Sequence, residues 1–234
     1  MASSQPALWS AATSGQLEEV RQLLAAGMNI DEKSLGGETA LHGVVCGGSD
    51  AIVELLLTKG AGVDCKTTCS NRDTALHLAA RLGHGAIVLL LLDKCAGVNV
   101  KNKNGDSALL LAVRGGHGAT VALFLDRGAG VSIKNKIGES ALHLAVRGGH
   151  GAIAEQLLAM GAGVNLRTNC GETSLHLAVH GGHGAMVALR LGGGAGVNIK
   201  NKPSALHFDA RLRQGTIVEQ LLEKGAEVNV KSVH

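Results

Sequence analysis

Histidine is the residue type in this sequence best suited to chemistry, because imidazole binds metals and transfers protons near neutral pH. Eleven histidines are present among 234 residues, and nine of them recur in two series at roughly 33-residue intervals. Stacked helices lie about 8–10 Å apart, whereas a zinc ligand lies about 2 Å from its metal. Neighbours within a series therefore cannot share a metal ion, and we expect neither a metal site nor a cofactor. The first series is His42, His77, His143, His176 and His207, and the second is His84, His117, His150 and His183.

Two closer pairs of side chains remain as candidate chelators. One is His180 with His183, and the other is Cys65 with Cys69. Neither pair has further ligands nearby, so an ordinary structural or surface role fits both better. The carboxylates are scattered along the chain, and no nucleophile stands with a base and an orienting group. We therefore expect no catalytic residues and no enzymatic activity.

The elements that hold these residues follow from a repeated leucine. Each of six leucines lies two residues after a Ser or Thr, and successive leucines are 35, 33, 33, 33 and 31 residues apart. A nearly fixed period of this length predicts one supersecondary unit stacked on copies of itself, with each copy packed only on its neighbours. The leucines are Leu41, Leu76, Leu109, Leu142, Leu175 and Leu206, and the hydroxyl residues are Thr39, Thr74, Ser107, Ser140, Thr173 and Ser204.

The unit at 137–167 shows what one copy contains. Ser140 is a favourable N-cap for a short apolar helix, which the glycine-rich segment 148–151 ends. A second helix with an apolar stripe follows, and Gly161 ends it as a left-handed cap. The polar residues before the next N-cap predict an extended, hairpin-like turn. Each copy is therefore predicted to be a helix, a turn, a helix and a protruding turn.

The first histidine series has a structural interpretation in this unit. Each histidine lies three residues after an N-cap, where its ring can bond the cap hydroxyl and the nearby backbone. Leu110 interrupts the series, so its unit should lack this hydrogen bond. The second series lies in the tight turn between helices, where we expect similar local hydrogen bonds. The structural residues are Thr39 with His42, Thr74 with His77, Ser140 with His143, Thr173 with His176, and His207.

The repeated unit resembles the ankyrin repeat. The matching segments are Thr-Ala-Leu-His-Leu-Ala-Ala at 74–80, Gly-His at 83–84, Ile-Val at 87–88 and Gly-Ala-Gly-Val-Asn at 161–165. The resemblance runs from about residue 6 to 231, with Ala or Ser where the family usually has Pro before the repeated Leu. It implies an all-α fold, an α-solenoid of stacked ankyrin repeats with helix-turn-helix units and β-hairpin-like turns. It also implies a non-catalytic protein–protein interaction scaffold, with the partner on the concave face of turn tips and first helices.

We expect a single ankyrin repeat domain over residues 1–234, with an N-terminal cap and about six repeats. One position is atypical, because Cys95 stands where the other full units have the Gly that ends the second helix. A side chain in a left-handed conformation costs about 1 kcal/mol. The predicted units are 6–31 (the cap), 36–66, 70–101, 104–134, 137–167, 170–200 and 203–231.

Basic residues lie where the resemblance puts the binding face. Guanidinium groups match carboxylates and phosphates, which favours an acidic or phosphorylated partner segment. An alternative stays open, because an acid directly precedes most N-caps and can pair with these cations: Glu38, Asp73, Asp106, Glu139 and Glu172. The basic residues are Arg81, Arg114, Arg147, His180 and Arg211, each five residues after a repeated Leu, and Lys101, Lys103, Lys134, Lys136 and Arg167 in the turns.

Composition narrows the classes of partner. The net charge is only +3 and aromatic residues make up 1% of the chain, which disfavours nucleic acid, because single-strand binding uses aromatics stacked on a basic track. No apolar run approaches about 18 residues, so we expect no membrane association. Five cysteines fit a reducing compartment, and hence an intracellular location, cytoplasmic or nuclear. We expect a monomer that binds another protein; the alternatives are a targeting or regulatory segment of a larger protein and, less favoured, a nucleic-acid binder.

The resemblance also implies one modification. In the family, the Asn that follows the second helix can be hydroxylated by an asparaginyl hydroxylase. The alternative, which we favour, is that this side chain bonds the turn backbone. The matching residues are Asn99, Asn165, Asn198 and Asn229.

Overall fold

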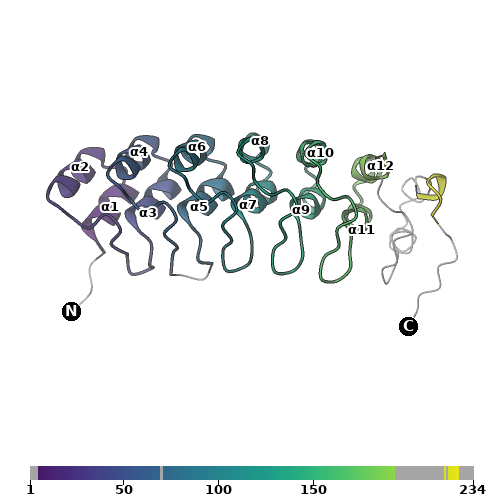
Figure 1. The fold of residues 1–234 in the computed structure, drawn as a ribbon, viewed down its shortest axis with the longest axis horizontal. Coiled ribbons are helices and arrows are strands. Elements are labelled where there is room, and N and C mark those ends of the chain that lie inside the picture. Colours follow the sequence, from purple (N-terminus) through teal and green to yellow (C-terminus); the bar gives the residue numbers. More distant parts are fainter. Residues whose placement is uncertain (1–4, 69–70, 193–218, 220, 227–234) are drawn as a thin grey trace. The chain divides into compact units, whose positions relative to one another are not determined.

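The structure, a computed structural model, describes residues 5–68, 71–192, 219 and 221–226, the side chains of 189–191 excepted. The described chain forms pairs of short helices, and a protruding turn follows each pair before the last one (Figure 1). The first helices of the pairs are α1 (Ala7–Thr13), α3 (Ala40–Gly47), α5 (Ala75–Leu82), α7 (Ala108–Arg114), α9 (Ala141–Arg147) and α11 (Ser174–His180). The second helices are α2 (Leu17–Ala25), α4 (Asp50–Thr58), α6 (Gly85–Asp93), α8 (Gly118–Asp126), α10 (Gly151–Ala159) and α12 (Gly184–Gly192).

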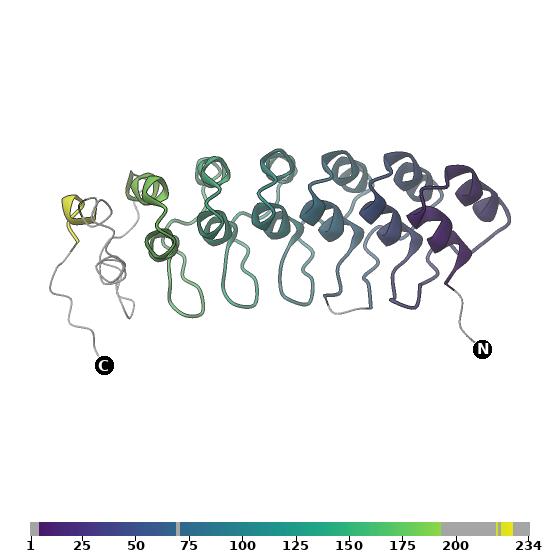
Figure 2. The same cartoon turned by 180° about the vertical axis from the view of Figure 1, so that it is seen from behind.

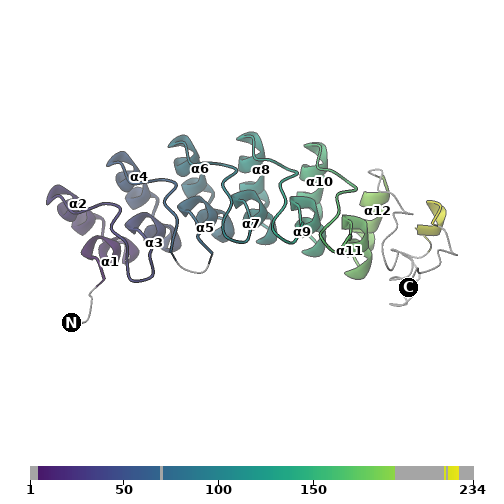
Figure 3. The ribbon, with the colours of Figure 1, turned by 60° about the horizontal axis from the view of Figure 1, so that its bottom comes forward.

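The chain divides into two compact units, Met1–Gly130 and Val131–His234. In the first unit, α1, α3, α5 and α7 pack side by side in chain order, and α2, α4, α6 and α8 form a second row against them (Figures 1 and 2). In the second unit, α9 packs against α10 and α11, and α11 packs against α12 (Figure 3). The predicted all-α stack of helix pairs is thus confirmed inside each unit. The single domain over 1–234 stays a prediction.

The protruding turns close through one repeated pair of hydrogen bonds. In one turn the backbone N–H of Thr168 donates to the carbonyl of Glu172 at 2.9 Å, and the N–H of Glu172 donates to Thr168 Oγ1 at 3.2 Å. This pattern is the expected hairpin-like turn, and the described residues contain a single isolated β-bridge, Lys134 with Ser140. The same two bonds join Ser34 with Glu38, Thr67 with Asp73, Asn102 with Asp106 and Asn135 with Glu139.

The first helices from α3 to α11 begin at the predicted caps, and at four of these caps a histidine of the first series adds hydrogen bonds. Thr74 Oγ1 lies 2.8 Å from His77 Nδ1, and the backbone N–H of Thr74 donates to the same nitrogen at 3.2 Å. A backbone N–H can only donate, so Nδ1 is unprotonated and the ring is neutral with its proton on Nε2. The expected hydrogen bond between ring and cap hydroxyl is therefore present at four caps. The other three are Thr39 with His42, Ser140 with His143 and Thr173 with His176.

At three of the four caps, those with His42, His77 and His143, the far side of the ring bonds a carbonyl further along the chain. His42 Nε2 lies 2.9 Å from the carbonyl of Cys65, and His77 Nε2 lies 3.1 Å from that of Asp106. Burial lowers the pKa of both histidines. His176 Nε2 is also buried but has no hydrogen-bond partner among the described residues, and burial lowers the pKa of His176 to about 4. Nearby Arg167 acts on this pKa in the same direction. His207 lies outside the described residues.

The interruption at Leu110 has the expected consequence. Ser107 Oγ accepts only the backbone N–H of Leu110, at 3.5 Å, whereas the histidine-bearing caps add bonds through the ring. Leu110 is 1% exposed, so an apolar contact replaces the ring. The prediction of a lost hydrogen bond in this repeat is confirmed.

His117, a member of the second histidine series, differs from its prediction. His117 Nε2 lies 3.0 Å from the carbonyl of Arg81 in the preceding repeat, so its bond is not a local one. The ring also fills the space over Gly83, where an added Cβ would lie only 2.6 Å from it. Because Gly83 has φ +74°, glycine suits this position both for its backbone and for the approach of the ring. Similar ring contacts reach Gly48 from His84 and Gly149 from His183.

Trp9 and Gly43 are complementary at the start of the first unit. Gly43 stands where the later first helices have Leu78, Leu111, Leu144 and Leu177. An added Cβ on Gly43 would lie 2.4 Å from Thr13 Cγ2 and 3.1 Å from Trp9 Nε1. The indole and the threonine methyl of α1 thus occupy the space that a leucine would need.

Candidate interaction surface

Arginines at the ends of the first helices each reach an acid at the start of the same helix. Arg81 Nη1 lies 2.9 Å from Asp73 Oδ2, and Arg114 makes two bonds of 3.2 Å to Asp106. Both acids are buried, with side chains 5% and 2% exposed, whereas the arginines are 44% and 48% exposed. Arg147 pairs with buried Glu139 in the same way. The structure therefore realises the alternative in which the acids neutralise these cations.

The geometry of a short helix explains this pairing. Each acid lies one residue before the N-cap and each arginine eight residues later, so two helical turns bring the groups to one face. The arginine at the helix C-terminus is also favoured by the helix dipole. The result is a guanidinium that is held in one place while about half of the side chain stays open to solvent.

An asparagine of the next turn supplies a further hydrogen bond to the carboxylate at the start of α5. Asn102 Nδ2 donates to Asp73 Oδ1 at 2.8 Å, so both carboxylate oxygens are bonded. Asn102 Oδ1 accepts the backbone N–H groups of Asn104 and Asp106, at 2.9 and 3.0 Å. This network joins the α5 repeat to the turn that leads into α7.

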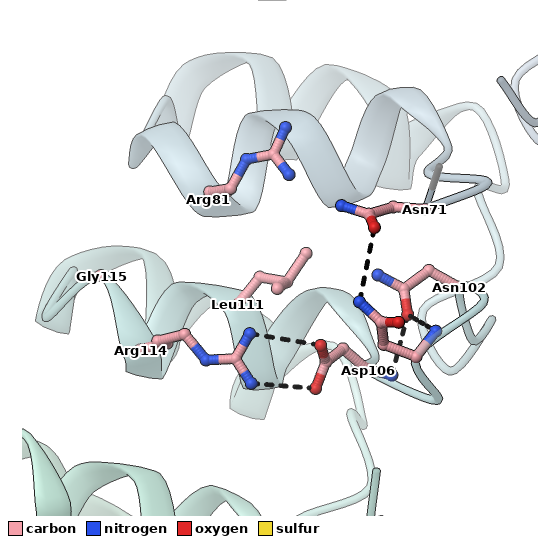
Figure 4. Close-up of a pocket in the computed structure, with 8 residues that line it drawn as sticks. Asn71, Arg81, Asn102, Asp106, Leu111, Arg114 and Gly115 are labelled. Carbon is pink, nitrogen blue, oxygen red and sulfur yellow. Dashed lines mark hydrogen bonds and ion pairs between the residues drawn. The ribbon is translucent and has the colours of Figure 1, made fainter. Parts of the chain in front are cut away.

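These groups surround a pocket of about 190 Å³ in the first unit. Figure 4 shows Leu111 between the arginine side chains, with the asparagines beyond them on the turn side. Leu111 is 4% exposed and gives the pocket an apolar surface. The lining includes Arg81, Arg114, Asn71, Asn102, Asn104 and Leu111.

Three of the predicted turn residues, Lys101, Lys134 and Arg167, take part in bonds between repeats, the first and last through their carbonyls. Lys134 Nζ donates to the carbonyl of Arg167 at 2.9 Å. Lys66 Nζ donates to the carbonyl of Lys101 at 3.0 Å, in an equivalent bond. These contacts give the lysines a structural role that the sequence did not reveal.

The remaining predicted residues that the structure describes are not among those that line the pocket. Lys103, Lys136 and Arg167 are exposed in their turns, and His180 is exposed at the end of α11. Cys46 takes the arginine position in α3, where burial raises the pKa of its thiol and the charge of Glu38 raises it further. Arg211 lies outside the described residues.

The asparagines of the pocket were missed from the sequence, although a signal was present. Asn102 occupies the turn position held elsewhere by Ser34, Thr67, Asn135 and Thr168, all of which accept the N–H of the following acid. A side-chain acceptor repeated at one position predicts a closed turn. It does not predict that an Asn there can reach the acid of the preceding repeat.

The Asn after the second helix bonds to the neighbouring repeat. Asn99 Oδ1 accepts the backbone N–H of Gly130 at 2.9 Å, as Asp31 and Asp64 do for Gly62 and Gly97. The expected bond to the turn backbone therefore exists, but the turn belongs to the next repeat. Asn198 and Asn229 lie outside the described residues.

Metal-binding clusters and membrane-spanning helices are both absent from the described part of the chain. There, no group of three His, Cys, Asp or Glu side chains is arranged to hold a metal ion. Cys69, one of the candidate chelators, lies outside that part. None of the helices described is long and apolar enough to cross a bilayer.

Comparisons with known proteins agree with this architecture. The crystal structure of the ankyrin repeat domain of Bcl-3, described as a unique member of the IkappaB protein family, superposes with a TM-score of 0.81. It shares 29% sequence identity over 93% of this chain and 98% of that one. No curated protein matches the sequence significantly. A family model described as ankyrin repeats in three copies matches residues 8–102, 94–168 and 149–232. The chain therefore belongs to the ankyrin repeat family.

Proposed function

We propose that this chain is a non-catalytic scaffold that binds another protein over its first-helix ends and turn tips. Ankyrin repeats typically mediate protein–protein interaction, and the family is generally non-catalytic. The observation that supports this face is the set of half-exposed arginines fixed on buried acids: Arg81, Arg114 and Arg147.

Fixed arginines are suited to recognition because their conformational entropy is already reduced. Ordering a flexible side chain at an interface costs about 0.5–1.5 kcal/mol, and a guanidinium held by a carboxylate avoids much of that cost. The exposed N–H groups remain available to a partner's acceptors. Aromatic anchors are scarce in the chain, so we expect modest affinity.

The pairing also changes the expected kind of recognition. Each arginine is neutralised by an acid within hydrogen-bond distance, which weakens long-range attraction. A partner is then selected by short-range hydrogen bonds more than by net charge. The lysines and arginines of the turns, Lys101, Lys103, Lys134, Lys136 and Arg167, add positive charge in this proposal.

The test is affinity capture from a cell extract by the immobilised chain, with quantitative mass spectrometry of the bound proteins. The variant Arg81→Gln/Arg114→Gln removes two groups of the proposed face. The matched control is Arg127→Gln, because Arg127 is also a partly exposed arginine in an ion pair, but one with Asp93 that links the second helices α6 and α8. Proteins lost with the double variant and kept by the control support the proposal. An identical bound set for all three chains contradicts it.

A further inference from the structure

The pocket between the α5 and α7 repeats has unequal numbers of free donors and acceptors. Arg81 uses Nη1 for Asp73, and Arg114 uses its two terminal nitrogens for Asp106. Their other N–H groups have no partner among the described residues. The amide nitrogen of Asn71 is likewise unbonded there, since only its oxygen is used, by Asn104 Nδ2 at 3.4 Å.

Most side-chain acceptors around the same pocket are already occupied. Asp73 is bonded at both oxygens, and Asp106 accepts both terminal nitrogens of Arg114. Asn102 Oδ1 accepts two backbone N–H groups. Asn104 Oδ1 is the main acceptor left. A ligand that enters the pocket therefore meets an excess of donors, which favours a group composed of acceptors.

We propose that this pocket binds the anionic oxygens of an acidic side chain, carboxylate or phosphate, on a peptide segment of the partner. The inference rests on the proposed scaffold function and names the chemistry of one subsite within it. A guanidinium presents N–H groups in a fork that matches such oxygens. The apolar surface of Leu111 suits the methylene groups that carry a glutamate carboxylate.

The size of the pocket agrees with one side chain. Its volume of about 190 Å³ lies below the range of about 300–1,000 Å³ that is typical of small-molecule sites. That volume accommodates a glutamate or a phosphoserine head group but not a packed helix or a nucleobase stacked on an aromatic, and no aromatic lines it. The rest of the segment would lie across the first-helix ends and turns.

The experiment uses the full chain and three capped octapeptides. One alternates glutamate with serine, one replaces each glutamate by glutamine, and one carries phosphoserine in place of glutamate. Binding is followed by the side-chain N–H resonances of Arg81 and Arg114 in NMR spectra at low salt, where charge contacts are least screened. We expect the glutamate or the phosphoserine peptide to bind about tenfold more tightly than the glutamine peptide, with shifts at both arginines.

Two variants separate binding from folding. Asn71→Asp adds a negative charge to the pocket without removing either ion pair, and it should weaken binding of the acidic peptide about tenfold. Arg127→Gln, on the second helices, should leave binding unchanged. The relative affinities of the glutamate and phosphoserine peptides then identify the source of the anionic oxygens.

The assignment is overturned if the glutamine peptide binds as well as both acidic ones, if neither arginine resonance shifts, or if Asn71→Asp has no effect. Its failure can be told apart from failure of the scaffold function. If extract proteins still depend on the two arginines but no acidic peptide is preferred, the scaffold stands and the pocket assignment falls. If acidic peptides bind but no extract protein is retained, the pocket assignment stands and the scaffold falls.

Discussion

Replacing Cys95 by glycine should stabilise the protein, because this position requires a left-handed backbone. Cys95 has φ 62°, and Arg72 is the other non-glycine described with positive φ. The equivalent residues that end second helices have φ between 75° and 90°. They are Gly27, Gly60, Gly128, Gly161 and Gly225. The structure thus confirms the strained cap that the sequence predicted.

The size of the effect follows from three contributions. A left-handed conformation costs an L-residue about 1–2 kcal/mol. Glycine reduces this gain in stability by about 0.4–1 kcal/mol, because an unfolded chain with glycine at this position has more conformational freedom to lose on folding. The thiol is exposed, so its removal loses little buried surface. The net expectation for Cys95→Gly is a rise of about 0.5–1 kcal/mol in the free energy of unfolding.

Equilibrium unfolding in urea under reducing conditions, followed by circular dichroism, measures this change. Because repeats can unfold separately, amide exchange at the end of α6 supplies a local measure. Cys95→Ala keeps the Cβ and should give no gain, while Gly128→Ala should lose about 1 kcal/mol. No steric clash contributes to that loss, since a Cβ on Gly128 would meet nothing within 4 Å. If Cys95→Ala stabilises as much as Cys95→Gly, the thiol is responsible and the backbone argument is refuted.

Three further outcomes are expected. The free energy of unfolding should fall as pH drops from about 6.5 towards 4, because burial lowers the pKa of His42, His77 and His176 and the unfolded chain binds protons first. Urea titrations across this pH range should show a loss of about 3 kcal/mol from His176 alone. The variant His176→Leu copies the leucine at position 110, and it should make the free energy of unfolding depend less on pH. Arg114→Gln should destabilise the chain by about 1–3 kcal/mol, because buried Asp106 loses both guanidinium bonds. Adding Asp106→Asn to the same chain should recover part of that loss. If Arg114→Gln is as stable as the wild type, the pairing is contradicted. Gly43→Leu should lower the free energy of unfolding in urea by about 1–3 kcal/mol, because the leucine would clash with α1. Adding Trp9→His to the same chain should restore part of that stability. Additive losses from the two substitutions would count against the complementary fit.

Local chemistry made much of the fold predictable from the sequence. The cap at Thr74 and the ring of His77 are three residues apart, so their bond depends only on helix geometry. The same holds for the loss at Leu110 and the left-handed backbone at Cys95. Hydrogen bonds between repeats were harder to predict from the sequence, because they depend on how one repeat packs on another. The bond from His117 to the carbonyl of Arg81 is such a case, since no pattern within one repeat identifies its partner.

The arginines show where sequence reasoning reached its limit. The sequence allowed Arg114 to serve a partner or to neutralise Asp106, and the choice depends on how deeply the turn buries the acid. The structure places that carboxylate at 2% exposure and leaves the arginine side chain 48% exposed, so the residue can serve both roles. A charge reversal at Arg114 would therefore set two carboxylates together in a buried place and unfold the repeat before it reports on binding. Variants that leave the ion pairs in place, such as Asn71→Asp, measure recognition separately from stability. A loss of binding by Arg81→Gln/Arg114→Gln counts as lost recognition only where its unfolding curve shows that the chain is still folded.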